Sequence, residues 1–409
     1  ALFSYDLKTK TVTQAAAPQD MEFKSASAGP GAIVIEEFGR ILLYNLKSAK
    51  LTTVPITISA DMLEVRPKLV KVARRLTNAH ISPAGARAVF EARGEILTVP
   101  AEKGDAHNIT NTPGVMERDP AWSPDGKSIA YFSDASGEYE LHVRDALGRQ
   151  PARIFKLAAK PTFYMGPLWS PDSKKIAYQD AHCQIWWLDI DKGVPVLVDK
   201  DIFQTRGRSL DWSPDSRWLA FSKQQPNHLR VVMLYALDSA KATALTDGMS
   251  DATNAVFDKG GKYLYFTAST DIGPSLEVDL HAIASRSTAS VYLAVLAKAE
   301  ASPFAPESDE EKVAANKTDE KKPEEKKPEE KKSPEIKIEF DKISQRILAM
   351  PLPPRRYVEL QAGKAGVLFA LESAQGAPGL IVHRYDLKQR KSDVVVSGVN
   401  FFELSANGE

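Results

Sequence analysis

One short phrase returns along the chain every 41 to 47 residues, and this repeat restricts the fold more than any other feature. Repeats of about 40 to 50 residues are typical of propellers and solenoids. Weaker copies begin at Ala26, Leu360 and Leu404. The clear copies are ISPAGARAVF from Ile81, WSPDGKSIAY from Trp122, WSPDSKKIAY from Trp169, WSPDSRWLAF from Trp212 and FDKGGKYLYF from Phe257.

Each copy has the same internal order. A turn rich in Pro, Asp, Gly and Ser precedes a strand of period two, in which Ile129 and Tyr131 alternate with Ala130 and Phe132. A second strand, a second turn such as LDIDKGV and a short third strand follow. Several short strands with two turns per unit indicate a four-stranded blade, and almost no segment has helical periodicity. The sequence therefore predicts an all-β chain built as a β-propeller.

The residues of the phrase have structural and functional interpretations. Trp122, Trp169 and Trp212 are either packing wedges between blades or stacking platforms for a ligand, and their common register favours wedges. The Asp of SPDG is either a turn residue or a calcium ligand, and the turn is favoured because no DxDxDG spacing accompanies it. The DIDKG segment at 189–193 is likewise read as a hairpin turn, so no metal site is predicted.

Composition excludes several classes of protein. The chain has 53 basic and 53 acidic residues, whereas nucleic-acid and anionic-membrane binders normally carry a basic excess. No run of about 18 apolar residues is present, so no membrane span is expected. No signal peptide is visible at the N-terminus. The single cysteine, Cys183, rules out an intrachain disulfide and fits a reducing compartment.

An insertion separates the copies at Phe257 and Leu360. Residues 305–335 are rich in Lys, Glu and Pro, and KKPEE recurs with a period of five residues. Proline at this spacing opposes a lasting helix, and few residues of the segment are suited to a core. We expect a disordered, solvated surface loop that serves as a spacer and is cut first by proteases, with a binding tail as the alternative. Strand pattern resumes after it, in IEFDKISQRILAMPLPPRRYVELQ.

Signatures of catalysis are absent from the sequence. It contains no GxSxG, HExxH, CxxC or P-loop string. His182 and Cys183 are adjacent in an expected strand, where neighbouring side chains point to opposite faces, so they are a poor nucleophile–base pair and are interpreted as structural. The pairs at Arg74–Arg75 and Arg355–Arg356 suit a peptide carboxylate by chemistry, but a solvated surface is the more frequent role. We predict no catalytic residue, no metal and no cofactor in this chain.

The repeat and its surroundings resemble a known family. ARAVFEARGEILTVPAEKGDAHNITNTPGVMERDPAWSPDGKSIAYFSD, TDGMSDATNAVFDKGGKYLYF, SPFAPESDEEK and ILAMPLPPRRY are similar to the seven-bladed propeller of tricorn proteases. The resemblance covers nearly the whole chain. It implies a six-bladed propeller, a seven-bladed one, a PDZ domain and a catalytic α/β domain in the whole protein.

The resemblance also divides the chain. Residues 1–60 are expected to be the last blade or blades of a six-bladed propeller, and 61–75 the crossover. Residues 70–409 are expected to form a seven-bladed propeller whose last blade is truncated. The seven turns are expected at Ser82, Ser123, Ser170, Ser213, Asp258, Gln361 and Ser405.

The function implied by the resemblance is access control in a serine peptidase that degrades short peptides. The partners would be peptide substrates in the propeller channel, the PDZ and catalytic domains, and further copies in a homo-oligomer; no nucleic acid and no membrane are expected. Two alternatives remain: a TolB-like protein-binding module, and the propeller of a prolyl-oligopeptidase-type enzyme. The expected compartment is the cytoplasm, or the periplasm if a signal peptide has been removed.

Overall fold

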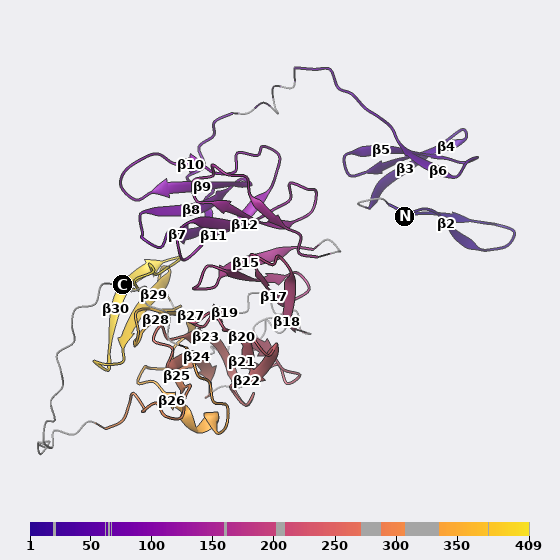
Figure 1. Cartoon of the computed structure of the whole chain (residues 1–409). Coiled ribbons are helices and arrows are strands. Elements are labelled where there is room, and N and C mark those ends of the chain that lie inside the picture. Colours follow the sequence, from indigo (N-terminus) through magenta and orange to yellow (C-terminus); the bar gives the residue numbers. More distant parts are fainter. Residues whose placement is uncertain are drawn as a thin grey trace, which may run out of the picture. The chain divides into compact units, whose positions relative to one another are not determined.

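The structure, a computed structural model, consists of two compact units, residues 1–69 and 70–409 (Figure 1). It describes residues 1–18, 22–61, 63, 66, 68–158, 162–201, 209–270, 288–306, 335–374 and 376–408. Most of the predicted loop at 305–335 and part of the predicted crossover at 61–75 lie outside these ranges. No helix among the described residues is both long and apolar enough to cross a membrane.

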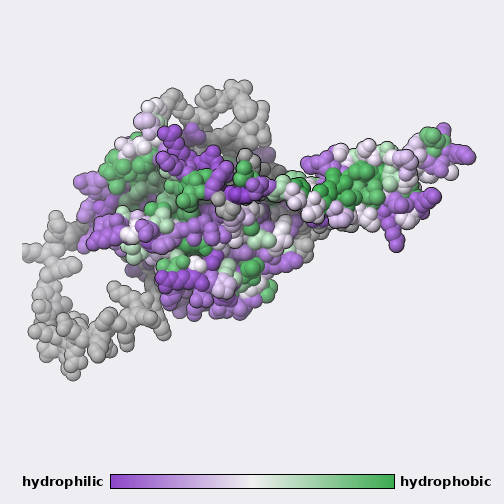
Figure 2. All heavy atoms as spheres, turned by 90° about the horizontal axis from the view of Figure 1, so that it is seen from above, coloured by the Kyte–Doolittle hydropathy of each residue, from purple (hydrophilic) through white to green (hydrophobic). Residues whose placement is uncertain are grey.

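The first unit is a hairpin and a four-stranded antiparallel sheet. The hairpin pairs β1 (Leu2–Tyr5) with β2 (Val12–Ala16). The sheet contains β3 (Phe23–Gly29), β4 (Ala32–Glu37), β5 (Arg40–Asn45) and β6 (Lys50–Thr53) in chain order. Ile35, Leu42 and Tyr44 form its buried core. Figure 2 shows hydrophobic side chains on the surface of this unit, and its exposed hydrophobics include Phe3, Val34, Phe38 and Leu46.

The described residues of the second unit form six four-stranded antiparallel sheets, each made of four strands consecutive in the chain. The first three sheets comprise β7 (Thr77–Ile81), β8 (Arg87–Ala92), β9 (Glu95–Pro100), β10 (His107–Asn108); β11 (Glu117–Trp122), β12 (Ser128–Ser133), β13 (Glu140–Asp145), β14 (Arg153–Phe155); β15 (Tyr164–Trp169), β16 (Lys175–Asp180), β17 (Gln184–Asp189), β18 (Pro195–Lys200).

The other three sheets have the same plan. They comprise β19 (Leu210–Trp212), β20 (Trp218–Gln224), β21 (Arg230–Ala236), β22 (Lys241–Ala244); β23 (Asp251–Phe257), β24 (Tyr263–Ser269), β25 (Ser290–Val295), β26 (Ile347–Ala349); β27 (Tyr357–Ala362), β28 (Val367–Glu372), β29 (Leu380–Asp386), β30 (Lys391–Val399). The first strands of successive sheets pack side by side, from β7 to β27. This is the predicted β-propeller of four-stranded blades.

The period-two pattern builds the core between blades. In β12, Ile129 and Tyr131 pack on the first sheet, whereas Ala130 and Phe132 pack toward the third. Phe132 stacks on Tyr164 with ring centroids 5.6 Å apart, and Tyr164 meets Tyr178 edge-on at 5.7 Å. Because alternate residues of one strand face opposite seams, each blade is held by apolar packing on both sides.

The phrase turns join the first and second strands of each blade. Ser123 Oγ donates to Asp125 Oδ1 at 2.6 Å, and the same Oδ1 accepts the Lys127 N–H. The predicted turn role of this Asp is confirmed, and Asp172 and Asp215 repeat it. The Asp189 carboxylate caps the 189–193 turn in the same way, by accepting the N–H groups of Asp191 and Lys192.

Two predicted positions need correction. The sixth phrase turn begins at Gly363, whose N–H donates to Val367 O, and not at Gln361. That turn is one residue shorter than the others, which displaced the alignment. The segment from Ile338, where strand pattern was expected to resume, contains β26 and most of β27, but before β26 it forms the 3-10 helix η2 (Ile343–Arg346), which starts after the left-handed Lys342. At Ser405, the Gly408 N–H donates to Ser405 O at 2.9 Å, as Gly126 does to Ser123, so a seventh turn follows β30.

Candidate functional site: the central cavity

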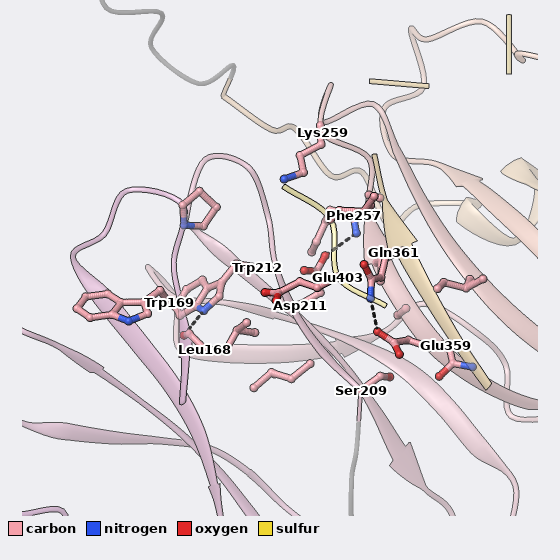
Figure 3. Close-up of a pocket in the computed structure, with 18 of the residues that line it drawn as sticks. Leu168, Trp169, Ser209, Asp211, Trp212, Phe257, Lys259, Glu359, Gln361 and Glu403 are labelled. Atoms are coloured by element: carbon pink, nitrogen blue, oxygen red, sulfur yellow. Dashed lines mark hydrogen bonds between the residues drawn. The ribbon is translucent and has the colours of Figure 1, made fainter. Parts of the chain in front are cut away.

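The first strands of the blades border an open cavity of about 730 Å³ (Figure 3). Its lining comes from β19, β23 and β27, the end of β15, and residues 401–406. A second cavity of about 470 Å³ is lined from β7, β11 and β15, and it shares His80 and Phe401 with the first. The hollow part of the propeller is thus built from chain segments that are far apart in sequence.

Prolines and tryptophans of the phrase line the cavity on the side of the turns. Pro124, Pro171 and Pro214 belong to three successive turns. The Trp169 indole N–H donates to Ala121 O and the Trp212 indole N–H to Leu168 O, each at 3.1 Å. Trp169 and Trp212 are 6 % and 4 % exposed. These side chains therefore fasten one blade to the one before it, and the predicted packing role is confirmed.

Two carboxylates make the same contact at different seams. Asp211 Oδ2 accepts the Phe257 N–H of the next blade at 2.7 Å, and Glu403 Oε2 accepts the Ile81 N–H of the first blade at 2.8 Å. Each residue stands two positions before the first residue of a phrase turn, Ser213 or Ser405. Glu403 Oε1 also lies 2.6 Å from His80 Nδ1.

Burial raises the pKa of two carboxyl groups that line the cavity, those of Asp211 and Glu359. Asp211 touches the cavity but is enclosed by protein, and this desolvation raises its pKa to about 6, although the Phe257 N–H and Lys259 oppose the shift. Burial also raises the pKa of Glu359, whose carboxylate accepts the Gln361 amide at 2.7 Å. Groups of both signs line the space, since Lys259 faces it together with these acids.

The first strands of four blades share a belt of left-handed residues. Asn78, Asp119, Gly166 and Asn254 have φ between 49° and 59°, and each stands three residues before the last residue of its strand. A β-bulge interrupts the strand register at these positions. The sequence analysis missed this belt, although the recurrence of Asn, Asp and Gly, which tolerate φ above zero, is a detectable signal.

The belt is tied together by polar contacts. Asn78 Nδ2 donates to Asp119 Oδ1 of the next blade and to Glu91 Oε2, both at 2.7 Å. Asp119 N–H in turn donates to Glu91 Oε2 at 3.1 Å. Burial raises the pKa of Asp119, with the Arg118 charge opposing the shift. These contacts fix the side chains that border the second cavity.

The residues considered for chemistry are dispersed. His182 and Cys183 lie in the turn before β17, not in a strand as assumed, and the His182 N–H donates to Asp180. Arg355 pairs with Glu372 at 2.6 Å, and His383 Nε2 lies 2.7 Å from the same carboxylate, so Arg355 serves a structural ion pair. Across the described residues, no group of three or more His, Cys, Asp or Glu is placed to hold a metal ion.

Comparison with known proteins agrees with this architecture. The family model described as "Tricorn protease second beta propeller domain" matches residues 76–409. The chain belongs to the tricorn protease family. It is 23% identical to the tricorn protease homolog of Saccharolobus solfataricus over 99% of this chain and 36% of that protein. It is 26% identical to tricorn protease homolog 1 of Streptomyces coelicolor over 90% of this chain and 35% of that protein.

A solved structure shows the same fold. The crystal structure of the tricorn protease superposes with a TM-score of 0.63 at 16% identity, over 99% of this chain and 38% of that chain. The chain thus spans about a third of the length of the tricorn relatives it matches. A family match over 76–409 favours this assignment over the TolB-like and prolyl-oligopeptidase-type alternatives.

Proposed function

We propose that this chain is the channel-bearing part of a serine peptidase that degrades short peptides. The match to the second tricorn propeller supports the proposal, together with an open cavity of about 730 Å³ bordered by the first strands. Peptides reach the catalytic groups through this cavity, and the blades restrict what enters. The catalytic Ser, His and acidic partner belong to domains outside this chain, next to a PDZ domain. Propellers commonly bind ligands at the ends of such channels.

The proposal includes a domain assignment. Residues 1–60 are the last blade or blades of a six-bladed propeller, and 70–409 are a seven-bladed propeller of which the seventh blade begins at the Ser405 turn. The division at 69/70 and the turn at Ser405 support this assignment. At full length the protein forms a homo-oligomer and acts in the cytoplasm, or in the periplasm if a signal peptide has been removed.

A substitution inside the cavity tests the channel role in the full-length enzyme. Val358 is 41% exposed and lines the cavity. Val358→Trp narrows the space, so we expect kcat/KM to fall more for long peptides than for dipeptide substrates. Val394, 62% exposed on β30, provides the matched control, since Val394→Trp adds the same bulk outside.

The outcomes separate clearly. Equal losses for short and long peptides, or equal effects of the two substitutions, contradict the channel role. The chain by itself is expected to hydrolyse no peptide, whereas the full-length product does. Hydrolysis by the isolated chain contradicts the assignment of the chemistry to other domains.

A further inference from the structure

The charges that line the large cavity are ordered by sign along its length. The lining includes a lysine, three carboxylates and a histidine: Lys259, Asp211, Glu359, Glu403 and His80. Lys259 belongs to a phrase turn, whereas Glu359 lies within β27. In Figure 3, Asp211 and Glu403 lie between these two residues. One end of the cavity is therefore cationic, and its middle and its other end carry carboxylates.

Lys259 supplies the cation at the mouth on the side of the phrase turns. Four earlier turns carry a proline at the position of Lys259: Pro83, Pro124, Pro171 and Pro214. Lys259 is exposed, and its ammonium group has no salt bridge and no hydrogen bond with any residue that the structure describes. An ammonium group has three N–H donors. Those of Lys259 are therefore available to an anionic group that enters the cavity.

Glu359 supplies the carboxylate at the other end. It stands three residues before the last residue of β27, the place that the left-handed belt residues occupy in four other first strands. Its Oε1 accepts the Gln361 amide at 2.7 Å, and Oε2 has no hydrogen-bond partner among the described residues. Glu359 is exposed toward the cavity. This oxygen is therefore available to a cationic group of a ligand.

The spacing of the two ends suits a short peptide. Glu359 stands four positions before Gly363, the first residue of its turn, whereas Lys259 directly follows the first residue of its own turn. Four positions of a strand span about 13 Å. An extended chain of about four residues has nearly the same length. The cavity volume of about 730 Å³ also lies in the usual range for small-ligand pockets.

A peptide with free ends carries an ammonium group at one end and a carboxylate at the other, and hydrogen bonds between such ions are stronger than neutral ones. Asp211 and Glu403 make the middle of the cavity unfavourable for a further carboxylate. We propose that the cavity binds peptides of about four residues in one orientation, with the carboxylate at Lys259 and the amino group at Glu359. This inference rests on the proposed channel role and adds a polarity to it.

Binding of tetra-alanine to the whole 409-residue chain tests the orientation. Isothermal titration calorimetry compares the free peptide with an N-acetylated form, a C-amidated form and a form blocked at both ends. Each modification removes one charge, so we expect each to weaken binding about 10-fold and the doubly blocked peptide to bind most weakly. Equal affinities for these peptides overturn the proposal, and so does the absence of binding by the free peptide.

Substitutions assign each end of the peptide to one residue. Lys259→Gln should remove the effect of amidation and keep that of acetylation, and Glu359→Gln should do the reverse. Lys364→Gln is the matched control, because Lys364 has the same position in the sixth turn but lies outside the cavity lining. It should leave every affinity unchanged. Loss of both effects from either cavity substitution, or an equal effect of the control, overturns the orientation.

The result is separable from the channel role. The comparison of modified peptides uses the wild-type chain, so it does not depend on the folding of any variant. Val358→Trp in the full-length enzyme measures the restriction of long peptides, whereas tetra-alanine measures the polarity of the cavity. Binding that ignores both peptide ends overturns the polarity and leaves the channel role standing. Equal kcat/KM losses with Val358→Trp contradict the channel role whatever the affinities are.

Discussion

The indole N–H distinguishes Trp122 from the two other phrase tryptophans. Trp169 and Trp212 donate to a carbonyl of the preceding blade, whereas Trp122 Nε1 has no partner among the described residues. Trp122 and Trp169 are almost equally buried, at 8 % and 6 % exposed. The same substitution at the two positions therefore separates the hydrogen bond from the packing.

We expect Trp169→Phe to lower the free energy of unfolding by about 1 kcal/mol more than Trp122→Phe, because it leaves Ala121 O without its donor. Both changes remove a similar volume. Urea denaturation of the two variants measures the difference. Equal losses would show that the bond to Ala121 adds nothing to packing.

The raised pKa of Asp211 makes stability depend on pH. Its pKa is about 6 in the folded chain against 3.8 for the ordinary group, so the folded state favours the protonated carboxyl. The stabilisation is complete below about pH 4 and is lost as pH rises through about 6.

We therefore expect wild type, relative to Asp211→Asn, to lose at most about 3 kcal/mol between pH 4 and pH 7, and less where cavity water meets the carboxylate. The Asn side chain still offers an oxygen to the Phe257 N–H but does not ionise. Urea titrations at several pH values compare the two proteins. Parallel pH profiles would contradict the raised pKa.

Side-chain roles within the phrase were predictable, but contacts between blades were not. Trp, Ser, Pro and Asp stand in one register, so their turn and wedge roles follow from local chemistry. The pairing of Asp211 with Phe257, or Glu403 with Ile81, joins residues that only the closed ring brings together. No pattern of spacing in one copy indicates them.

The bulge in the first strands depends on a left-handed residue. At Asn254, φ is 54°, and a β-branched side chain is strained there. We expect Asn254→Val to destabilise the chain by about 1–2 kcal/mol relative to Asn254→Gly. Both variants lose the 3.3 Å bond to Thr267, so the difference reports on the backbone. Thermal unfolding measures it, and equal melting temperatures would contradict the strain.

Strands were predicted where the period-two pattern is continuous. β12, β16 and β20 follow their turns as expected. Each of these strands packs against a neighbouring blade on both faces, so its apolar residues are buried on both sides. The pattern failed at 338–346, where Ile338, Phe340 and Ile343 face one apolar cluster without forming a strand. Ile343 stands three positions after Phe340, so the period of two is broken there, and the apolar residues indicate burial without fixing the backbone.

The two units have separate cores. Ile35, Leu42 and Tyr44 form a cluster within residues 1–69, and the other clusters lie within 70–409. We expect Leu42→Ala to destabilise the first unit by about 2–5 kcal/mol without changing hydrogen exchange in the second. Leu264→Ala in the second unit is the matched control with the opposite expectation. Faster exchange in both units from either variant would contradict their independence.

The architecture was the most predictable property of the whole molecule. Repeats at a nearly constant spacing leave few arrangements other than a propeller, and six four-stranded sheets confirm it. A central channel was expected, but the size of the cavity and the charges that line it were not. Both depend on which side chains of the first strands the bulges turn toward the cavity.

Four of the contacts that fasten neighbouring blades share one property: a side chain meets a backbone atom. Trp169 and Trp212 bind carbonyls, and Asp211 and Glu403 bind N–H groups. A backbone carbonyl is present whatever residue occupies the position, and a backbone N–H is present at every residue except proline. One blade can therefore diverge in sequence without a compensating change in its neighbour, and correlated substitutions between homologues should be weak at these joints.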